Sequence, residues 1–414
     1  MKLKNILPLV FCSLALQIKS QDLSEFKFVL PQSKNSIGAK TELFAGSDAL
    51  SNSLFTTLLK GQFLDTKLKN ESLILMDDKN NAGLQWHSTI EFTKSQVNFL
   101  GLKNADWSLS LSNHNSIEAR FNKDLYELFF FGNAPFENRL AKFQDLEFIN
   151  LNYQMIETGF KQWTSRFGFG LKVAYVNGHA YLDLETTRGS LFTATNGTYL
   201  DLDLKLESKM SNPDKIDFGS MNGQGAALSI FGGFKFNENA SVSLDLDRIG
   251  FISWNAESQK RSIDTMVHFE GIVVNNLLDS IYVDIKSTEE IKNEFIKIQP
   301  SQKFKTSLPF HVTLKYDQFI FNHKIHWSTQ LAYYNSKINT PYVETKLNYF
   351  LFPGFCFGPV LGFGGYSKWN AGIQTSVLIL KTLYIHANAA SLVNLLNQEK
   401  PAVLIGSVQV KLLF

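Results

Sequence analysis

Hydrophobic and polar residues alternate one by one along many short stretches of this chain, and this pattern constrains the fold more than any other feature. In residues 199–208 the two sets are Leu200, Leu202, Leu204 and Leu206 against Asp201, Asp203, Lys205 and Glu207. Successive side chains of a β-strand point to opposite faces, whereas a helix would scatter these residues around its surface. The pattern therefore predicts strands with one apolar and one polar face.

The alternation recurs in residues 241–254, 325–333 and 343–349. In 241–254, Arg248 falls on the side of the apolar residues, so we expect it near a strand end or a bulge. The residues expected to share that side are Val242, Leu244, Leu246, Gly250, Ile252 and Trp254. Other strands are predicted to begin near Ile37, Gly83, Ala105, Leu146, Arg166, Gln224, Arg261, Lys305, Phe355, Ala371, Leu383 and Val403.

These stretches predict an all-β chain: a transmembrane, antiparallel β-barrel of about 14 strands, a count that agrees with the even numbers favoured by bacterial barrels. After residue 20 no uninterrupted apolar segment reaches the ~18 residues of a membrane-spanning helix, which argues against a helical membrane protein. Aromatic residues make up 13% of the chain, and most tryptophans lie near predicted strand ends, as in interfacial girdles. Core packing is the alternative for each of them.

Both ends of the chain agree with export to an outer membrane. Residues 1–20 combine Lys2 and Lys4 with an apolar stretch, which predicts a signal peptide, and residues 21–414 form one barrel domain. The last strand places Gly406, Val408, Val410, Leu412 and Phe414 on one face. That ending resembles the insertion signal of outer-membrane barrels, so the barrel assembly machinery and outer-membrane lipid are the expected contacts.

Two segments have helical rather than strand spacing. Residues 47–76 include Ser47 or Asp48 as an N-cap, followed by leucines at helical intervals. Residues 280–297 include a sequence compatible with a capping box at 287–290. We expect the first segment to be a plug or a periplasmic helical segment; short helices lying across loops are the alternative for both.

No constellation of residues predicts catalysis, cofactor binding or a metal site. Asp201, Asp203, Asp245 and Asp247 could bind a cation, but alternation alone would place them along the lumen. His311, His323 and His326 do not converge, because a strand puts the last two on opposite faces. The Gly-x-Gly sequences at 168–170 and 223–225 lie within predicted strands, where close packing or a bulge explains them better than phosphate binding does. The net charge of +2 gives no reason to expect nucleic-acid binding.

Several blocks resemble a Bacteroidota outer-membrane family of unknown function. They are residues 131–133, 151–180, 223–227, 247–254 and 308–310, in this order across most of the chain. In the block at 247–254, Asp247-Arg248-Ile249-Gly250 differs from the family's usual Asp-Leu-Gly by one inserted residue. The resemblance implies a barrel and its compartment. A looser, fold-level similarity is to FadL-like barrels, which take up hydrophobic molecules.

Three functions remain open at this stage. The first is an outer-membrane passive or gated route for small or hydrophobic solutes. The second is a non-enzymatic structural or accessory barrel in a surface-export or nutrient-uptake complex, with protein partners in that membrane. The third is a barrel hydrolase, but no Gly-x-Ser-x-Gly elbow or other local motif identifies a nucleophile, so we expect no enzyme.

Overall fold

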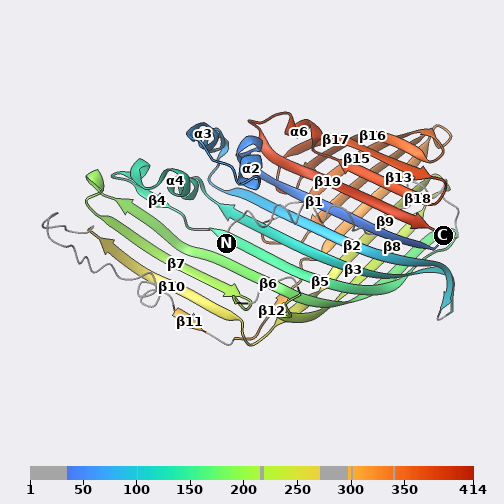
Figure 1. Cartoon of the computed structure of the whole chain (residues 1–414), viewed down its shortest axis with the longest axis horizontal. Coiled ribbons are helices and arrows are strands. Elements are labelled where there is room, and N and C mark those ends of the chain that lie inside the picture. Colours follow the sequence, from blue (N-terminus) through green and yellow to red (C-terminus); the bar gives the residue numbers. More distant parts are fainter. Residues whose placement is uncertain (1–34, 100, 215–218, 271–296, 300–301, 339–340) are drawn as a thin grey trace.

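The chain folds into a closed antiparallel barrel of fourteen strands, as the sequence predicts (Figure 1). The computed structural model describes residues 35–99, 101–214, 219–270, 297–299, 302–338 and 341–414. Around the ring the strands are β1 (Ser36–Ser51), β2 (Asn80–Phe99), β3 (Leu102–Phe121), β5 (Glu147–Trp163), β6 (Phe167–Thr193), β8 (Gly223–Lys235), β9 (Ala240–Trp254), β13 (His311–Ile320), β14 (Ile325–Tyr334), β15 (Tyr342–Phe352), β16 (Phe355–Gly364), β17 (Trp369–Ile379), β18 (Leu383–Ala389) and β19 (Pro401–Leu413). Pairing of β19 with β1 closes the ring.

The two ends of the barrel differ in their connections. At the end that holds Asn35 and Phe414, the turns at 164–166, 236–239, 321–324, 353–354 and 380–382 have two to four residues. At the other end most connections are longer and carry helices: α2 (Asn52–Leu59), α3 (Thr66–Leu75), α4 (Lys123–Phe131), η4 (Ala134–Phe136), η5 (Thr195–Gly197) and α6 (Leu392–Leu395). We call these the short-turn end and the long-loop end.

A sheet continues beyond the barrel at the long-loop end (Figure 1). The second half of β6 pairs with β7 (Leu200–Met210), and β7 pairs with β10 (Gln259–Phe269). Three short strands complete the sheet: β4 (Leu140–Lys142) on β6, β11 (Lys297–Gln299) on β10 and β12 (Phe304–Ser307) on β9. The strands predicted near residues 199 and 261 therefore exist, but they form this arm instead of the barrel wall.

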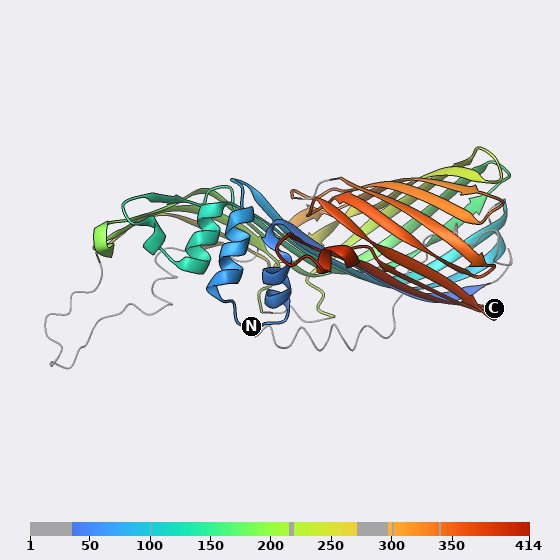
Figure 2. The same cartoon turned by 90° about the horizontal axis from the view of Figure 1, so that it is seen from above.

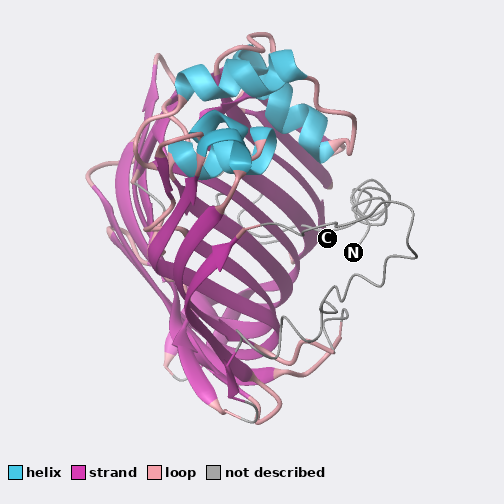
Figure 3. Ribbon diagram, turned by 90° about the vertical axis from the view of Figure 1, so that its left-hand side faces the viewer, coloured by secondary structure: helices cyan, strands magenta, loops and turns pink. Residues whose placement is uncertain are grey.

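Helices α2, α3 and α4 gather at the long-loop end, away from the C-terminus (Figure 2). Viewed from that end, they lie over one part of the strand ring (Figure 3). They share a small apolar core in which Leu54 and Tyr126 are buried. None of their residues lines the lumen cavity described below, and a plug or periplasmic segment at 47–76 stays a prediction.

The helix start predicted at Ser47 or Asp48 is wrong. Residues 47–51 belong to β1, because the Ser47 hydroxyl and the Asp48 carboxylate bind the backbone of Asn81 on β2. Ser51 is the N-cap of α2 and accepts a hydrogen bond from the Leu54 backbone N–H. The predicted signal peptide and almost all of the predicted helix at 280–297 lie outside the described residues.

The outer face of the barrel wall is apolar. Side chains with more than a third of their surface exposed include Leu109, Leu111, Ile156, Leu171, Val173, Leu244, Leu314, Leu331, Leu361, Ile373, Val408 and Val410. This is the band that a membrane barrel presents to lipid. Trp107, Trp327 and Trp369 also face outward, whereas Trp254 is buried inside, so the girdle interpretation fits only part of the tryptophan set. No helix in the described part of the chain is long and apolar enough to span a bilayer.

The apolar band predicts an asymmetric response to arginine substitution. Val173 lies midway along the wall segment of β6, so Val173→Arg should destabilise the folded protein in lipid vesicles by about 2–4 kcal/mol. Met266 is exposed on β10 of the arm, and Met266→Arg should change stability by less than ~0.5 kcal/mol. Urea unfolding measures both; equal effects would contradict a lipid-facing band confined to the wall.

Candidate functional site

The lumen of the barrel is lined by polar side chains. Along β3 the inward residues are Ser108, Ser110, Ser112, His114, Ser116 and Glu118, each at most 8% exposed. They alternate with outward residues such as Leu109 and Leu111. On β14 and β15 the predicted faces are confirmed, because His326, Glu344 and Asn348 are buried inside. Since every second wall residue points inward, the polar face of the sequence pattern becomes the lumen.

Most buried lysines in the lumen are paired with carboxylates. Lys172 lies between Glu91 and Glu157, with N–O distances of 3.2 and 3.3 Å. Lys346 pairs with Glu344 at 2.8 Å, and Lys315 pairs with Asp317 at 3.3 Å. Burying a charge is costly unless it is paired, so these contacts let a wall rich in ionisable residues remain folded.

A cavity of about 270 Å³ occupies the lumen between β1–β3, β18 and β19 on one side and β9, β13, β14 and β15 on the other. Asp245 and Asp247 line it, as the alternation predicts, but Asp201 and Asp203 do not, because β7 lies in the arm. His311 also lines the cavity, whereas His326 bonds to Asp317 and His323 lies in a short turn. Within the described residues no group of three or more His, Cys, Asp or Glu could hold a metal ion.

Arg248 projects into this cavity from a β-bulge. The register of β8 and β9 shifts here, so that Asp247 and Arg248 together oppose Ser229. Arg248 has a φ of 64°, a left-handed conformation that costs a non-glycine residue about 1–2 kcal/mol. The residue inserted in the family block is therefore the extra residue of a β-bulge. The prediction of a bulge near Arg248 is confirmed.

The bulge also reverses which side chains of β9 point inward and which point outward in the rest of the strand. Residues before it alternate as predicted, with Leu244 outward. After it the alternation is inverted: Ile249 and Phe251 are exposed, whereas Ile252 and Trp254 are buried inside the barrel. The prediction that Ile252 and Trp254 share a face with Leu244 is wrong, because the extra residue shifts the pleat by one.

Trp254 belongs to an apolar cluster inside the barrel, towards the long-loop end. Its ring packs on Gly178 of β6 and Gly223 of β8, where a Cβ atom would come within 2.8 and 2.9 Å of it. It stacks on Tyr181 at 5.5 Å between ring centroids, and its Nε1–H donates to the Thr306 hydroxyl. Close packing therefore explains the glycines of two family blocks, as predicted for Gly223-Gln224-Gly225.

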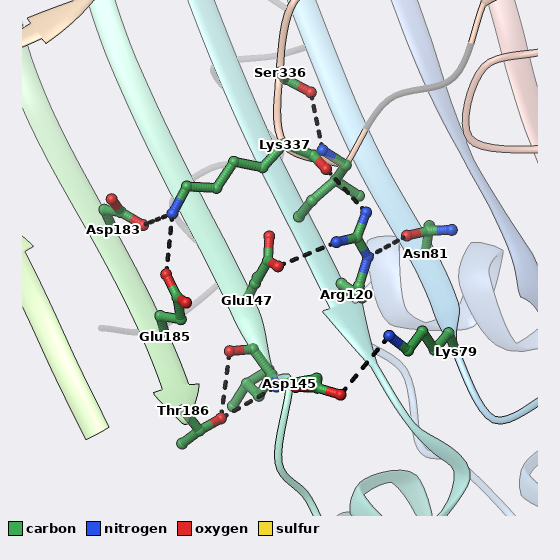
Figure 4. Close-up of polar contacts among 12 residues, drawn as sticks. Lys79, Asn81, Arg120, Asp145, Glu147, Asp183, Glu185, Thr186, Ser336 and Lys337 are labelled. Carbon is green, nitrogen blue, oxygen red and sulfur yellow. Dashed lines mark hydrogen bonds and ion pairs between the residues drawn. The ribbon is translucent and has the colours of Figure 1, made fainter. Parts of the chain in front are cut away.

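Four residues of the connection between β14 and β15, Asn335–Ile338, reach across the mouth of the barrel at the long-loop end, and we call them the strap. The Arg120 guanidinium on β3, on the opposite side of the ring, donates to the Lys337 backbone carbonyl at 2.9 Å and also pairs with Glu147 at 3.1 Å. The Lys337 ammonium reaches Asp183 and Glu185 on β6, at 3.3 and 3.2 Å (Figure 4).

The strap is held by partly exposed ion pairs of Lys337 and by the buried side chain of Ile338. Partial burial alone would lower the pKa of Lys337, but the carboxylates of Asp183 and Glu185 outweigh that effect and hold the pKa above its usual value. The three side chains are 15–48% exposed, and ion pairs in such positions typically contribute about 0–1 kcal/mol each. The ion pairs of Lys337 can therefore be broken at low cost, whereas the burial of Ile338 adds an apolar contact to the strap.

A second bridge comes from the turn between β16 and β17. The Tyr366 hydroxyl donates to Glu118 on β3 and accepts from the Gln85 amide on β2, both at 2.6 Å. Its ring, only 1% exposed, covers Gly83 of β2 so closely that a Cβ atom there would lie 2.3 Å from it. Sequence alternation did not identify the strap or Tyr366, because both depend on loops that fold inward.

The closed ring, apolar outer band and polar lumen define a membrane-type β-barrel. Within that class the chain belongs to a family of unknown function, DUF5723, whose model matches residues 21–379. The predicted membership of a family without an established activity is confirmed at that level. No functionally curated protein matches the sequence.

Solved structures similar to this chain include three hydrocarbon-channel or FadL-type barrels. They are a deltaS2S3 mutant of the monoaromatic hydrocarbon channel TodX (9% identity, 94% of this chain and 91% of that chain, TM-score 0.47), the Pseudomonas putida toluene transporter TodX (8%, 92% and 88%, 0.41) and a Pseudomonas aeruginosa FadL homologue (8%, 92% and 88%, 0.39). At this identity and TM-score, the likeness says nothing about the solute of this chain.

The contact between Tyr366 and Gly83 predicts a coupled pair. Gly83→Ala should cost about 1–3 kcal/mol of stability, since the new methyl group would overlap the Tyr366 ring. In a Tyr366→Ala background the same change should cost much less, as urea unfolding would reveal. Gly232→Ala is the control, because a Cβ atom there has nothing within 4 Å. Additive losses from Gly83→Ala and Tyr366→Ala would contradict the contact.

Proposed function

We propose that this chain is an outer-membrane barrel of a Gram-negative bacterium and provides a gated route for small polar solutes. The observation that carries the proposal is the lumen itself: a cavity lined by charged and hydroxyl side chains inside a wall whose outer face is apolar. Lipid would surround the apolar band, and the barrel assembly machinery would insert the chain. The polar lining favours polar solutes over the hydrophobic ones that the sequence left open.

The unequal ends support an orientation. Membrane barrels have short periplasmic turns and longer extracellular connections, so the long-loop end with its arm and helices would face the cell exterior. The strap and Tyr366 both belong to that end and cross the lumen to β3. We assign them the role of an outer gate whose release opens the route.

Charge reversal in the strap tests this gate. Lys337→Glu would place a third carboxylate against Asp183 and Glu185, and repulsion should release the strap. In planar bilayers the variant should conduct in longer or more frequent openings, at least threefold above the wild type. Lys400→Glu makes the same charge change at another long-loop connection and should leave conductance unchanged.

Removal of both bridges provides the decisive comparison. If Lys337→Glu combined with Tyr366→Ala conducts no ions and admits no small polar solute into liposomes, the proposed route is wrong. The folded state of that variant is checked by its far-UV circular dichroism. Conductance that is equal in the wild type and in every variant would retain the pore and reject the gate.

A second function, an accessory barrel in a surface-export or nutrient-uptake complex, is favoured by the arm. β6, β7 and β10 extend a sheet beyond the barrel, where a protein partner could bind. Affinity purification in mild detergent from native membranes tests this alternative. A stoichiometric partner that is lost when β7 and β10 are replaced by a short linker would favour it, and a lone monomer would count against it.

A further inference from the structure

We propose that Arg248 is the centre of a binding site for small monocarboxylates within the lumen cavity. The inference names the solute class and so rests on the proposed function, but it concerns binding and can be tested without transport. Arg248 lines the cavity and is only 5% exposed. Its guanidinium is thus a buried charge placed where a solute would pass.

The backbone is arranged to bring this side chain inside. Without the bulge, position 248 would share the outward face of Leu244 and Leu246, and a charge there would meet lipid. The left-handed φ of 64° and the bond from the Arg248 backbone N–H to the Ser229 hydroxyl hold the bulge. Strain of this kind persists where the surrounding structure over-determines it, and such residues cluster at ligand sites.

The guanidinium has fewer partners than its burial requires. Its Nη1 donates to Nδ1 of His114 at 3.2 Å, and the Tyr334 ring lies 5.7 Å from its central carbon. The buried Nε–H has no hydrogen-bond acceptor, and within the described part of the chain no carboxylate lies within ion-pair distance of Arg248. Lys172, also buried in the lumen, has two carboxylates.

A carboxylate supplies what the site lacks. Its two oxygens match the planar donors of a guanidinium, and this charge-assisted pair is stronger than a neutral hydrogen bond. His114 accepts from Arg248 at Nδ1 while its Nε2 lies 2.9 Å from the Ser112 hydroxyl, and an imidazole is no counter-ion for the guanidinium. The site therefore favours an anion that approaches Nε.

Charge and size limit that anion. Four cations of the cavity lining match four carboxylates: Lys40, Arg248, Lys315 and Lys346 against Glu42, Asp245, Asp247 and Glu344. Because the lining has no surplus positive charge, a singly charged anion fits better than a phosphate dianion. The cavity volume of about 270 Å³ is enough for a short organic acid. Phe44 and Tyr342 offer apolar contacts for its tail.

Binding of propionate to the purified full chain in detergent tests the site by isothermal titration calorimetry. We expect saturable binding of propionate, and at least tenfold weaker binding of propionamide, which has the same shape without charge. Arg248→Gly should weaken propionate binding at least tenfold while keeping the bulge, because glycine accepts a φ of 64°. Arg248→Lys keeps the charge without the planar fork and should give an intermediate loss.

Arg188→Gln is the matched control, because Arg188 pairs with Asp203 and Asp264 on the arm and should not affect propionate binding. Equal propionate binding by wild type and Arg248→Gly would overturn the proposal, as would tighter binding of inorganic phosphate than of propionate. Conductance without propionate binding would reject this site and retain the route. Propionate binding that depends on Arg248 in a chain that never conducts would retain the site and reject the route.

Discussion

The pairing of β1 with β19 is the interaction on which the rest of the structure depends. A membrane leaves no water for unpaired backbone groups, so a sheet can cross it only if its first and last strands meet. Here they meet in register from Ser36 opposite Leu413 to Gly46 opposite Val403. That register decides which side chains enter the lumen, because a slip of one residue would turn every side chain of a strand to the other face.

Closure of the ring encloses charged side chains and empty space, and the interior accommodates each of them differently. Towards the short-turn end and the middle, charged side chains are paired inside the lumen, as Lys172 of β6 is with Glu157 on the neighbouring β5 and with Glu91 on the more distant β2. Towards the long-loop end, Trp254 fills the space above Gly178 and Gly223. The strap and Tyr366 then join opposite parts of the wall. The lumen is thus a partly packed core with a polar cavity, and Arg248 is a buried charge in the lining of that cavity.

The wall of this protein could be predicted from its sequence, because alternation is a local property. The starts of β14, β15 and β16 are predicted within one or two residues, and the predicted inward and outward faces of β14 and β15 are correct. The arm was not distinguished from the wall, since β7 alternates like a barrel strand and only its pairing with β10 separates it. The sequence predicts a helix cap at Ser47, because a hydroxyl cap is recognised from neighbouring residues alone. The conformation of Ser47 depends instead on the pairing of β1 with the distant β2.

The candidate site was predictable only in part. Arg248 was expected at a bulge because it broke the pattern, and Asp245 and Asp247 were expected in the lumen. The reversal of faces after the bulge was missed, since nothing in residues 249–254 alone indicates that the pleat has shifted. The partners of Lys337 and Tyr366 come from strands far away in the sequence, and such contacts depend on the completed ring.

The length of β6 has a mechanical consequence. Its 27 residues span about 90 Å when extended, whereas crossing a bilayer takes about 9–11 residues of a tilted strand. One unbroken strand is therefore wall at one end and arm at the other. Asp183 and Glu185, which hold the strap, lie between the two. A force on the end of β6 in the arm would be transmitted through the hydrogen bonds between strands to those two carboxylates. Displacement of the arm would therefore act on the contacts that hold Lys337 of the strap.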